Sequence, residues 1–244
     1  MRRVQVFDVN ETLLDLAAMD PHFERVFGDA GMRRQWFTQM IQSALVATVT
    51  GAYRTFAEIG AAALAMTAEQ AGVELRQEDR DAIAGQLRRL PVHPEVPEAL
   101  ERLRQAGYRL AALTNSTEQV ARAQLEHAGI IGLFEQVLSA DAVRRLKPAP
   151  EPYLMAAERL GVAIGEVRLV AAHAWDVAGA TRAGCAAAFV ARPGKVLDPL
   201  VEPPDIAGAD LAEVAERILA VDTTPGSSAA TSASSASRAG SSSR

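Results

Sequence analysis

The stretch VQVFDVNETLLD (residues 4–15) decides how this chain folds. Its first four residues form a brief apolar run, which is typical of a buried strand. A carboxylate, Asp8, stands where that strand should end, and an amide, Asn10, follows two positions later. Because ligands bind beyond the carboxyl ends of strands in open parallel sheets, Asp8 is predicted to lie at a functional site.

Four further apolar runs, at 109–114, 136–140, 167–172 and 186–191, have the same strand-like character. Helical patterns alternate with them, at 94–107, 117–129, 150–161 and 175–184. Each of these patterns ends in Ala-Gly or Leu-Gly, as expected where a glycine caps a helix before the next strand. Alternating strands and helices with short joints predict an α/β fold with a parallel sheet and right-handed crossovers.

The interval between the first two strands is about a hundred residues long, far more than one crossover helix requires. Helical patterns fill much of it, at 33–48, 55–72 and 76–90, and a cluster of prolines from position 91 marks the return. We therefore expect an all-helical insertion over residues 15–91, placed over the end of the first strand like a lid. Residues 1–14 and 92–222 then form the core.

Composition excludes several classes of protein. Residues 223–244 are mostly Ser, Ala, Gly and Thr, and such a segment is expected to be disordered. The net charge of −5 argues against a nucleic-acid partner, and the lack of about 18 consecutive apolar residues argues against a membrane partner. A single cysteine, Cys185, and the absence of a signal peptide favour a cytoplasmic location.

Polar side chains also follow the later strands. Thr114 and Asn115 follow the second strand, Lys147 follows the third, and His173 and Asp176 follow the fourth. Each has an ordinary structural explanation, such as helix capping, an exposed loop lysine or a packed histidine. Because parallel strands end at the same edge of a sheet, the whole set together with the first-strand aspartate indicates a site.

Four segments, FDVNETLLD, LTNST, KPAPEPY and WDVAGATRAG, resemble the haloacid dehalogenase superfamily in order and spacing, and the resemblance extends over residues 1–222. It implies an α/β fold whose Rossmann-like parallel sheet core has helices on both faces. It also implies an all-helical cap inserted after the first strand, in agreement with the layout expected from periodicity.

The resemblance also separates two activities. Phosphatases of the superfamily carry a second aspartate two residues after the nucleophile and an acidic pair near the fourth strand that helps to hold Mg²⁺. Here those places hold Asn10, and Ala172 with His173. The chain resembles the (S)-2-haloacid dehalogenase branch most, in which an aspartyl ester forms and is hydrolysed to a 2-hydroxy acid. Halide leaves without a proton, so no second acid is required, and no metal or cofactor is implied.

The resemblance to this branch implies catalytic roles for four residues of the chain. Asp8 is the nucleophile, and Lys147 keeps it ionised and attracts the anionic substrate. Asp176 pairs with Lys147 and helps to activate water. The hydroxyl of Thr12 and neighbouring backbone N–H groups stabilise the oxyanion of ester hydrolysis.

The substrate, a small carboxylic acid, is expected to meet a second set of residues. Thr114 matches a family serine that binds the carboxylate, and Asn115 matches an asparagine that contacts the halide. Tyr153 matches a supporting tyrosine near the lysine. Asn10 stands where the branch has an aromatic pocket residue, and Trp175 is assigned to the same pocket.

Further positions depart from the branch. Ala171 and His173 stand where it has a serine and an asparagine, so His173 is either a replacement base for water or a packed histidine. The cap arginine that cradles the halide has no match, and the nearest residue is Gln42, although Arg33, Arg34 or Arg54 could reach the site instead. Without a cap cation, either neutral donors hold the halide or the substrate is unusual; fluoride as the leaving group is one hypothesis.

Two other functions stay open at this point. One is a Mg²⁺-dependent phosphatase of small molecules on the same scaffold. The other is a catalytically altered member with a non-classical substrate or no activity. A homodimer is a further possibility, since the apolar run ALVATVTGAY (44–53) lies in the expected cap, although core packing also explains such a run.

Overall fold

A parallel sheet of six strands forms the centre of the molecule in the computed structural model, which describes residues 2–223. The strands are β1 (Val4–Phe7), β2 (Leu110–Thr114), β3 (Gln136–Ser139), β4 (Val167–Ala171), β5 (Ala186–Val190) and β6 (Ile206–Gly208). Their order is β3-β2-β1-β4-β5-β6, and every pair is parallel. The α/β prediction is thus confirmed, and only β6 lacks a predicted counterpart. The order reverses between β1 and β4, where ligands bind in such sheets.

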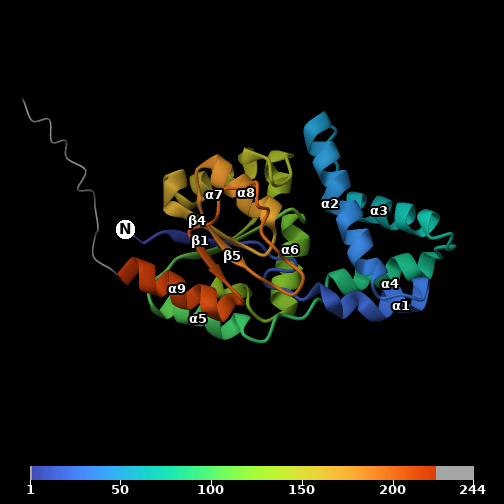
Figure 1. Cartoon of the computed structure of the whole chain (residues 1–244), viewed down its shortest axis with the longest axis horizontal. Coiled ribbons are helices and arrows are strands. Elements are labelled where there is room, and N and C mark those ends of the chain that lie inside the picture. The colour runs from blue at the N-terminus through green and yellow to red at the C-terminus, as the bar shows by residue number, and fades with distance from the viewer. Residues whose placement is uncertain (1, 224–244) are drawn as a thin grey trace, which may run out of the picture.

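Helices cover both faces of this sheet, as Figure 1 shows. Alternate strand residues point to opposite faces. Phe7 and Val170 belong to one core cluster, whereas Val6 and Leu169 belong to the other. The first cluster includes residues of α5 (Val96–Gln105), α6 (Glu118–His127) and α9 (Leu211–Thr223), and the second includes residues of α7 (Pro150–Leu160) and α8 (Ala174–Ala183).

A second group of helices lies between β1 and α5 in sequence and beside the sheet in space (Figure 1). These are α1 (Asp20–Phe27), α2 (Met32–Thr50), α3 (Phe56–Gln70) and α4 (Gln77–Leu87), of which α1 was not predicted. Trp36 of α2 connects α1 and α3, because its ring lies 5.4 Å from that of Phe23 on α1 and its Nε1–H donates to the Gly60 carbonyl on α3 at 2.9 Å. We call α1–α4 the cap helices.

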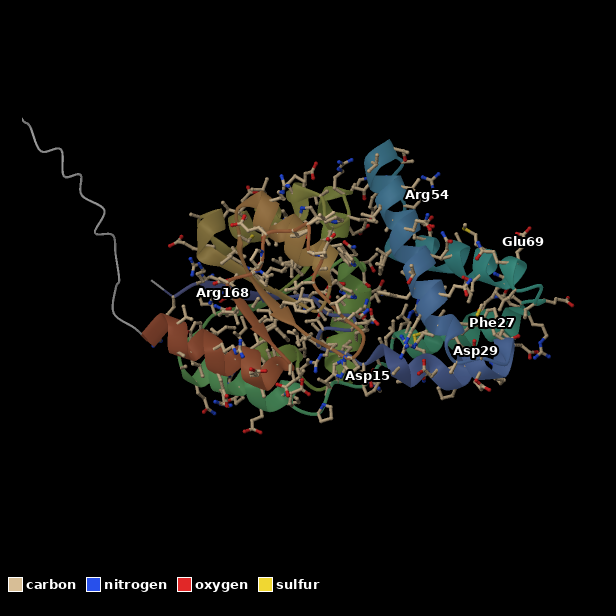
Figure 2. The ribbon with its side chains drawn as sticks, in the orientation of Figure 1. Asp15, Phe27, Asp29, Arg54, Glu69 and Arg168 are labelled. Atoms are coloured by element: carbon tan, nitrogen blue, oxygen red, sulfur yellow. The ribbon has the colours of Figure 1, made fainter. Side chains whose placement is uncertain are left out.

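The two segments that connect the cap helices to the sheet run side by side. The Asp15 amide donates to the Pro91 carbonyl at 2.8 Å, and the His93 amide donates to the Leu13 carbonyl at 3.0 Å. Asp15 lies at the junction between the two groups of elements in Figure 2. This paired crossing holds the cap helices at the β1 end of the sheet, next to Asp8.

Three further predictions concern the ends and the surface. The predicted disordered tail lies outside the described residues except for Thr223, which is the last residue of α9 rather than the first of the tail. Within residues 2–223, no helix has the length and apolar character needed to cross a membrane. Leu45, Val46 and Val49 are exposed on α2, and the homodimer stays a prediction.

Candidate active site

Asp8 follows β1 directly and is 4% exposed. Its backbone amide donates to the Val170 carbonyl of β4 at 3.0 Å, which fixes it at the point where the strand order reverses. Its Oδ2 accepts a hydrogen bond from the Thr12 hydroxyl at 2.7 Å, and that hydroxyl accepts from the Ala172 amide at 3.0 Å. The carboxylate is therefore held in one orientation by the turn after β1 and by the end of β4.

Lys147 binds the other oxygen of Asp8. Its Nζ donates to Asp8 Oδ1 at 2.9 Å, to Asp176 Oδ2 at 2.6 Å and to a main-chain carbonyl, that of Leu113, at 2.9 Å. An ammonium group has three hydrogens, so all of them are in use. Burial alone would lower the pKa of Lys147, but the two carboxylates raise it above its usual value. The lysine thus keeps its charge and has no N–H left for a substrate.

Asp176 and Tyr153 lie behind this lysine. Asp176 is in the first turn of α8, and its Oδ1 accepts a hydrogen bond from the Tyr153 hydroxyl at 2.6 Å. Both carboxylate oxygens of Asp176 are therefore hydrogen bonded, one to the tyrosine and one to Lys147. This arrangement fits residues that hold the lysine in position.

The charge state of Asp8 follows from these neighbours. Burial alone would raise the pKa of Asp8, but Lys147 and His173 outweigh burial and hold the pKa well below its usual range. The group is therefore a carboxylate at neutral pH. A buried, ionised carboxylate with little access to water is suited to act as a nucleophile.

His173, the N-cap residue of α8, lies between two acids. Its Nδ1 is 3.3 Å from Asp8 Oδ2, and its Nε2 is 2.8 Å from Glu11 Oε2. Burial alone would lower the pKa of His173, but the hydrogen bonds and charges of Asp8 and Glu11 raise it above its usual value. His173 therefore contacts the nucleophile, and its ring also stacks on that of Trp175, with the two ring centres 5.1 Å apart.

Glu11 is a site residue that the sequence analysis missed. Its backbone has a φ of 61°, in the left-handed region that non-glycine residues rarely adopt. Its Oε2 also contacts the Lys195 ammonium at 2.5 Å. Burial alone would raise the pKa of Glu11, but His173 and Lys195 lower it to about 2. Glu11 is therefore ionised and faces the outer nitrogen of His173.

A small pocket opens above Asp8. The residues that line it are Asp8, Asn10, Phe37, Ile41, Phe56, Thr114, Asn115, His173 and Trp175. The structure thus brings together six of the residues predicted from the sequence. The other three, which the sequence analysis missed, come from α2 and α3 and give the pocket an apolar wall.

Gln42 does not line this pocket, although the sequence analysis assigned it to the substrate. It is exposed on α2, whereas Phe37 and Ile41, four residues apart on one helix face, line the pocket. Successive helix residues are about 100° apart, so the position after Ile41 faces away. The residue predicted to meet the halide therefore lies one position after the helix face that lines the pocket.

The arginines considered for the cap lie elsewhere. Arg33 and Arg34 line a neighbouring cavity of about 430 Å³ between α2 and the segment 192–195. The Arg33 guanidinium is paired with Asp20 and also lies 3.7 Å from Glu11 Oε1, and Arg54 is exposed beyond the end of α2 (Figure 2). None of these three arginines lines the pocket above Asp8.

Thr114 and Asn115 are fixed by nearby main chain. Thr114 Oγ1 accepts a hydrogen bond from the Ser116 amide at 3.1 Å, which leaves its hydroxyl hydrogen for a ligand. Asn115 Oδ1 accepts from the Lys147 amide at 2.8 Å, and its Nδ2 donates to the Lys147 carbonyl at 3.3 Å. One N–H of that amide remains available to the pocket.

The acids of the site are poorly suited to hold Mg²⁺. Within residues 2–223, no group of three or more His, Cys, Asp or Glu side chains is arranged to hold a metal ion. Asp8 and Asp176 already share the Lys147 ammonium, which occupies the place of a cation between them. The donor set of this site therefore does not fit the ion that the phosphatases use.

Comparison with known proteins agrees with this geometry. The model of a family of hydrolases, described as haloacid dehalogenase-like hydrolase, matches residues 3–184. This match spans most of the chain, so the chain belongs to the haloacid dehalogenase-like hydrolase family.

Among its relatives, haloacetate dehalogenase H-2 of Moraxella sp. (strain B) is 29% identical over 209 residues, covering 84% of this chain and 93% of that protein. (S)-2-haloacid dehalogenase 4A of Burkholderia cepacia is 30% identical over 184 residues, covering 75% of this chain and 80% of that protein. The structure of L-2-haloacid dehalogenase from Xanthobacter autotrophicus with chloropropionic acid covalently bound matches with a TM-score of 0.83 and 26% identity, covering 90% of this chain and 99% of that one.

Proposed function

We propose that this protein is a hydrolytic dehalogenase of short 2-haloalkanoic acids, which forms an ester on Asp8 and releases halide and the 2-hydroxy acid. The observation that carries the proposal is an ionised Asp8 held by Lys147 in a small pocket with no acid at position 10. The relatives support it as well, since their names give haloacetate and (S)-2-haloacids as the substrates.

The first step is a displacement at carbon. An oxygen of Asp8 forms a bond to the carbon that bears the halogen, and the halogen leaves with the bonding electron pair. The Thr114 hydroxyl and the N-terminus of α6, which begins four residues later, suit the substrate carboxylate. Phe37, Ile41 and Phe56 suit a short alkyl group.

The second step is hydrolysis of the ester. Esterification removes the negative charge of Asp8, which is one of the two acids that hold a proton on His173. The imidazole then loses that proton more readily, and its Nδ1 faces the Asp8 carboxyl group, where water must attack. Glu11 keeps the hydrogen on Nε2, so the nitrogen that faces the ester is the basic one.

The tetrahedral intermediate needs donors for its oxyanion. Thr12 donates to one oxygen of Asp8, and Lys147 donates to the other. Whichever oxygen carries the ester, the remaining oxygen keeps a hydrogen-bond donor. Collapse of the intermediate releases the hydroxy acid and restores the Asp8 carboxylate.

Halide release tests this function. We expect chloride to be released from (S)-2-chloropropionate in the presence of EDTA and at an unchanged rate after added Mg²⁺. The (R) enantiomer is the matched control substrate. No chloride from either enantiomer, together with Mg²⁺-dependent phosphate release from small phosphomonoesters, would show a phosphatase instead.

The pair formed by Glu11 and His173 predicts a pH effect. Ester hydrolysis requires neutral His173, so its rate falls as pH drops below the pKa of that histidine. The Glu11 carboxylate raises this pKa. In Glu11→Gln the fall of the hydrolysis rate on the acidic side of the pH profile should therefore move to lower pH, by roughly one pH unit. The rate of ester decay in single turnovers, measured against pH, checks this. Glu69→Gln, an exposed change in the cap helices (Figure 2), should leave the pH at which the rate falls unchanged. If that pH is also unchanged in Glu11→Gln, then Glu11 does not set the pKa of the group that hydrolyses the ester.

A further inference from the structure

The leaving halide has no arginine and no lysine with a free hydrogen as a partner in the pocket. No arginine lines it, and Lys147 already donates all three hydrogens. The two nitrogens of His173 face Glu11 and Asp8. Since the charge of His173 is directed at these two acids, neutral donors are left to meet the negative charge that develops on the halogen.

The orientation of one such donor, Asn10, is set by two neighbours. The Nε2 group of Gln124, on α6, donates to the Leu87 carbonyl at 2.7 Å and to Asn10 Oδ1 at 3.1 Å. A main-chain carbonyl can only accept, so the nitrogen of Gln124 must face it. The same nitrogen then faces Asn10, which must present its oxygen to Gln124 and keep its own nitrogen for another partner.

That partner is missing from the protein itself. Asn10 is 6% exposed and lines the pocket with Asp8, and its side-chain hydrogen bond to the rest of the described chain is the one that its Oδ1 accepts. Both hydrogens of this amide are therefore available to an acceptor that arrives with the substrate.

We propose that Asn10 Nδ2 donates a hydrogen bond to the leaving halide, held in that orientation by Gln124. This inference rests on the proposed function and names the residue that selects the halogen. Hydrogen bonds to anions strengthen as the anion becomes smaller and more basic. The hydrogen bond from Asn10 therefore assists the departure of fluoride more than that of chloride, and of chloride more than that of bromide.

The first test compares two leaving groups. Asn10→Leu should lower kcat/KM for (S)-2-chloropropionate by about tenfold and for (S)-2-bromopropionate by only about threefold, since a hydrogen bond to an anion is lost. Gln124→Met keeps Asn10 but no longer fixes the orientation of its amide. It should also lower the ratio of kcat/KM for (S)-2-chloropropionate to that for (S)-2-bromopropionate. Ile41→Leu, which changes the pocket wall without removing a donor, should leave the ratio unchanged. Equal losses for both halides in Asn10→Leu would overturn the proposal.

The second test needs no turnover. In Asp8→Asn, position 8 is neutral, as it is in the ester, and chloride binding is measured by the fluorescence of Trp175 beside the pocket. Adding Asn10→Leu should weaken chloride binding by about tenfold. If the wild type releases no halide but chloride binding depends on Asn10, the proposed function fails, whereas binding of halide by Asn10 is supported. Chloride binding that is unchanged by Asn10→Leu sinks the inference, whatever the activity.

Discussion

Asp8→Asn is expected to abolish halide release, with kcat lowered by at least about 10⁴-fold, the scale seen when a covalent nucleophile is removed. The carboxamide has the shape of the carboxylate, but it is neutral and a poor nucleophile. The ion pair with Lys147 is lost as well, so the folded fraction of the variant is to be compared by circular dichroism. Steady-state chloride release from (S)-2-chloropropionate measures the effect. Activity within tenfold of the wild type would show that another group attacks the carbon.

Isotope transfer tests the same bond directly. In a single turnover in ¹⁸O water, attack of water on the Asp8 carboxyl carbon places the label in the side chain and leaves the oxygen of the first product unlabelled. Mass spectrometry of the peptide that contains residue 8 should show the label. A labelled product beside an unlabelled peptide would mean that water attacks the substrate carbon without an ester.

His173→Gln is expected to separate the two halves of the reaction. Displacement of halide needs no base, whereas ester hydrolysis does, so kcat should fall by about 10²- to 10⁴-fold while the ester accumulates. Intact-protein mass spectrometry after addition of (S)-2-chloropropionate should show the added mass of the propionate group, and halide should appear in a burst of one equivalent.

His127→Gln provides the matched control, because His127 is exposed on α6. It should turn over without a detectable ester. If His173→Gln also shows no ester and keeps its rate of product formation, then His173 is not the base. Asp176→Asn would be the next variant to examine, since Asp176 is the acid that the family resemblance assigns to water activation.

The core of the fold was predictable because its signals are local. Each of five strands is an apolar run between turn residues, so the sequence alone places these strands within a residue of their observed bounds, and the glycines that follow the helices of the core place those helices within two. β6 has only three residues, too few for a pattern. α1 does carry a sequence signal, a proline in its first turn and an amphipathic pattern, but over only eight residues, and the prediction did not include it.

The site was predictable where it depends on strand ends and was missed where it depends on side-chain direction. Asp8, Lys147 and Asp176 meet because the sheet is parallel. Glu11 was missed because its contact with His173 spans 162 positions and requires an unusual backbone angle. Gln42 was misplaced because one residue along a helix changes the face by about 100°.

The left-handed backbone of Glu11 has a practical consequence for anyone who engineers this protein for heat resistance. Glycine suits such a backbone better than a residue with a Cβ, so a search for strained positions would select Glu11 and Arg144, the two non-glycine residues with positive φ in the part of the chain described. At Arg144 the exchange removes a surface contact with the Tyr53 ring, whereas at Glu11 it removes the carboxylate opposite His173. Thermostability and turnover therefore conflict at one of these positions only, and Arg144→Gly is the exchange to make first.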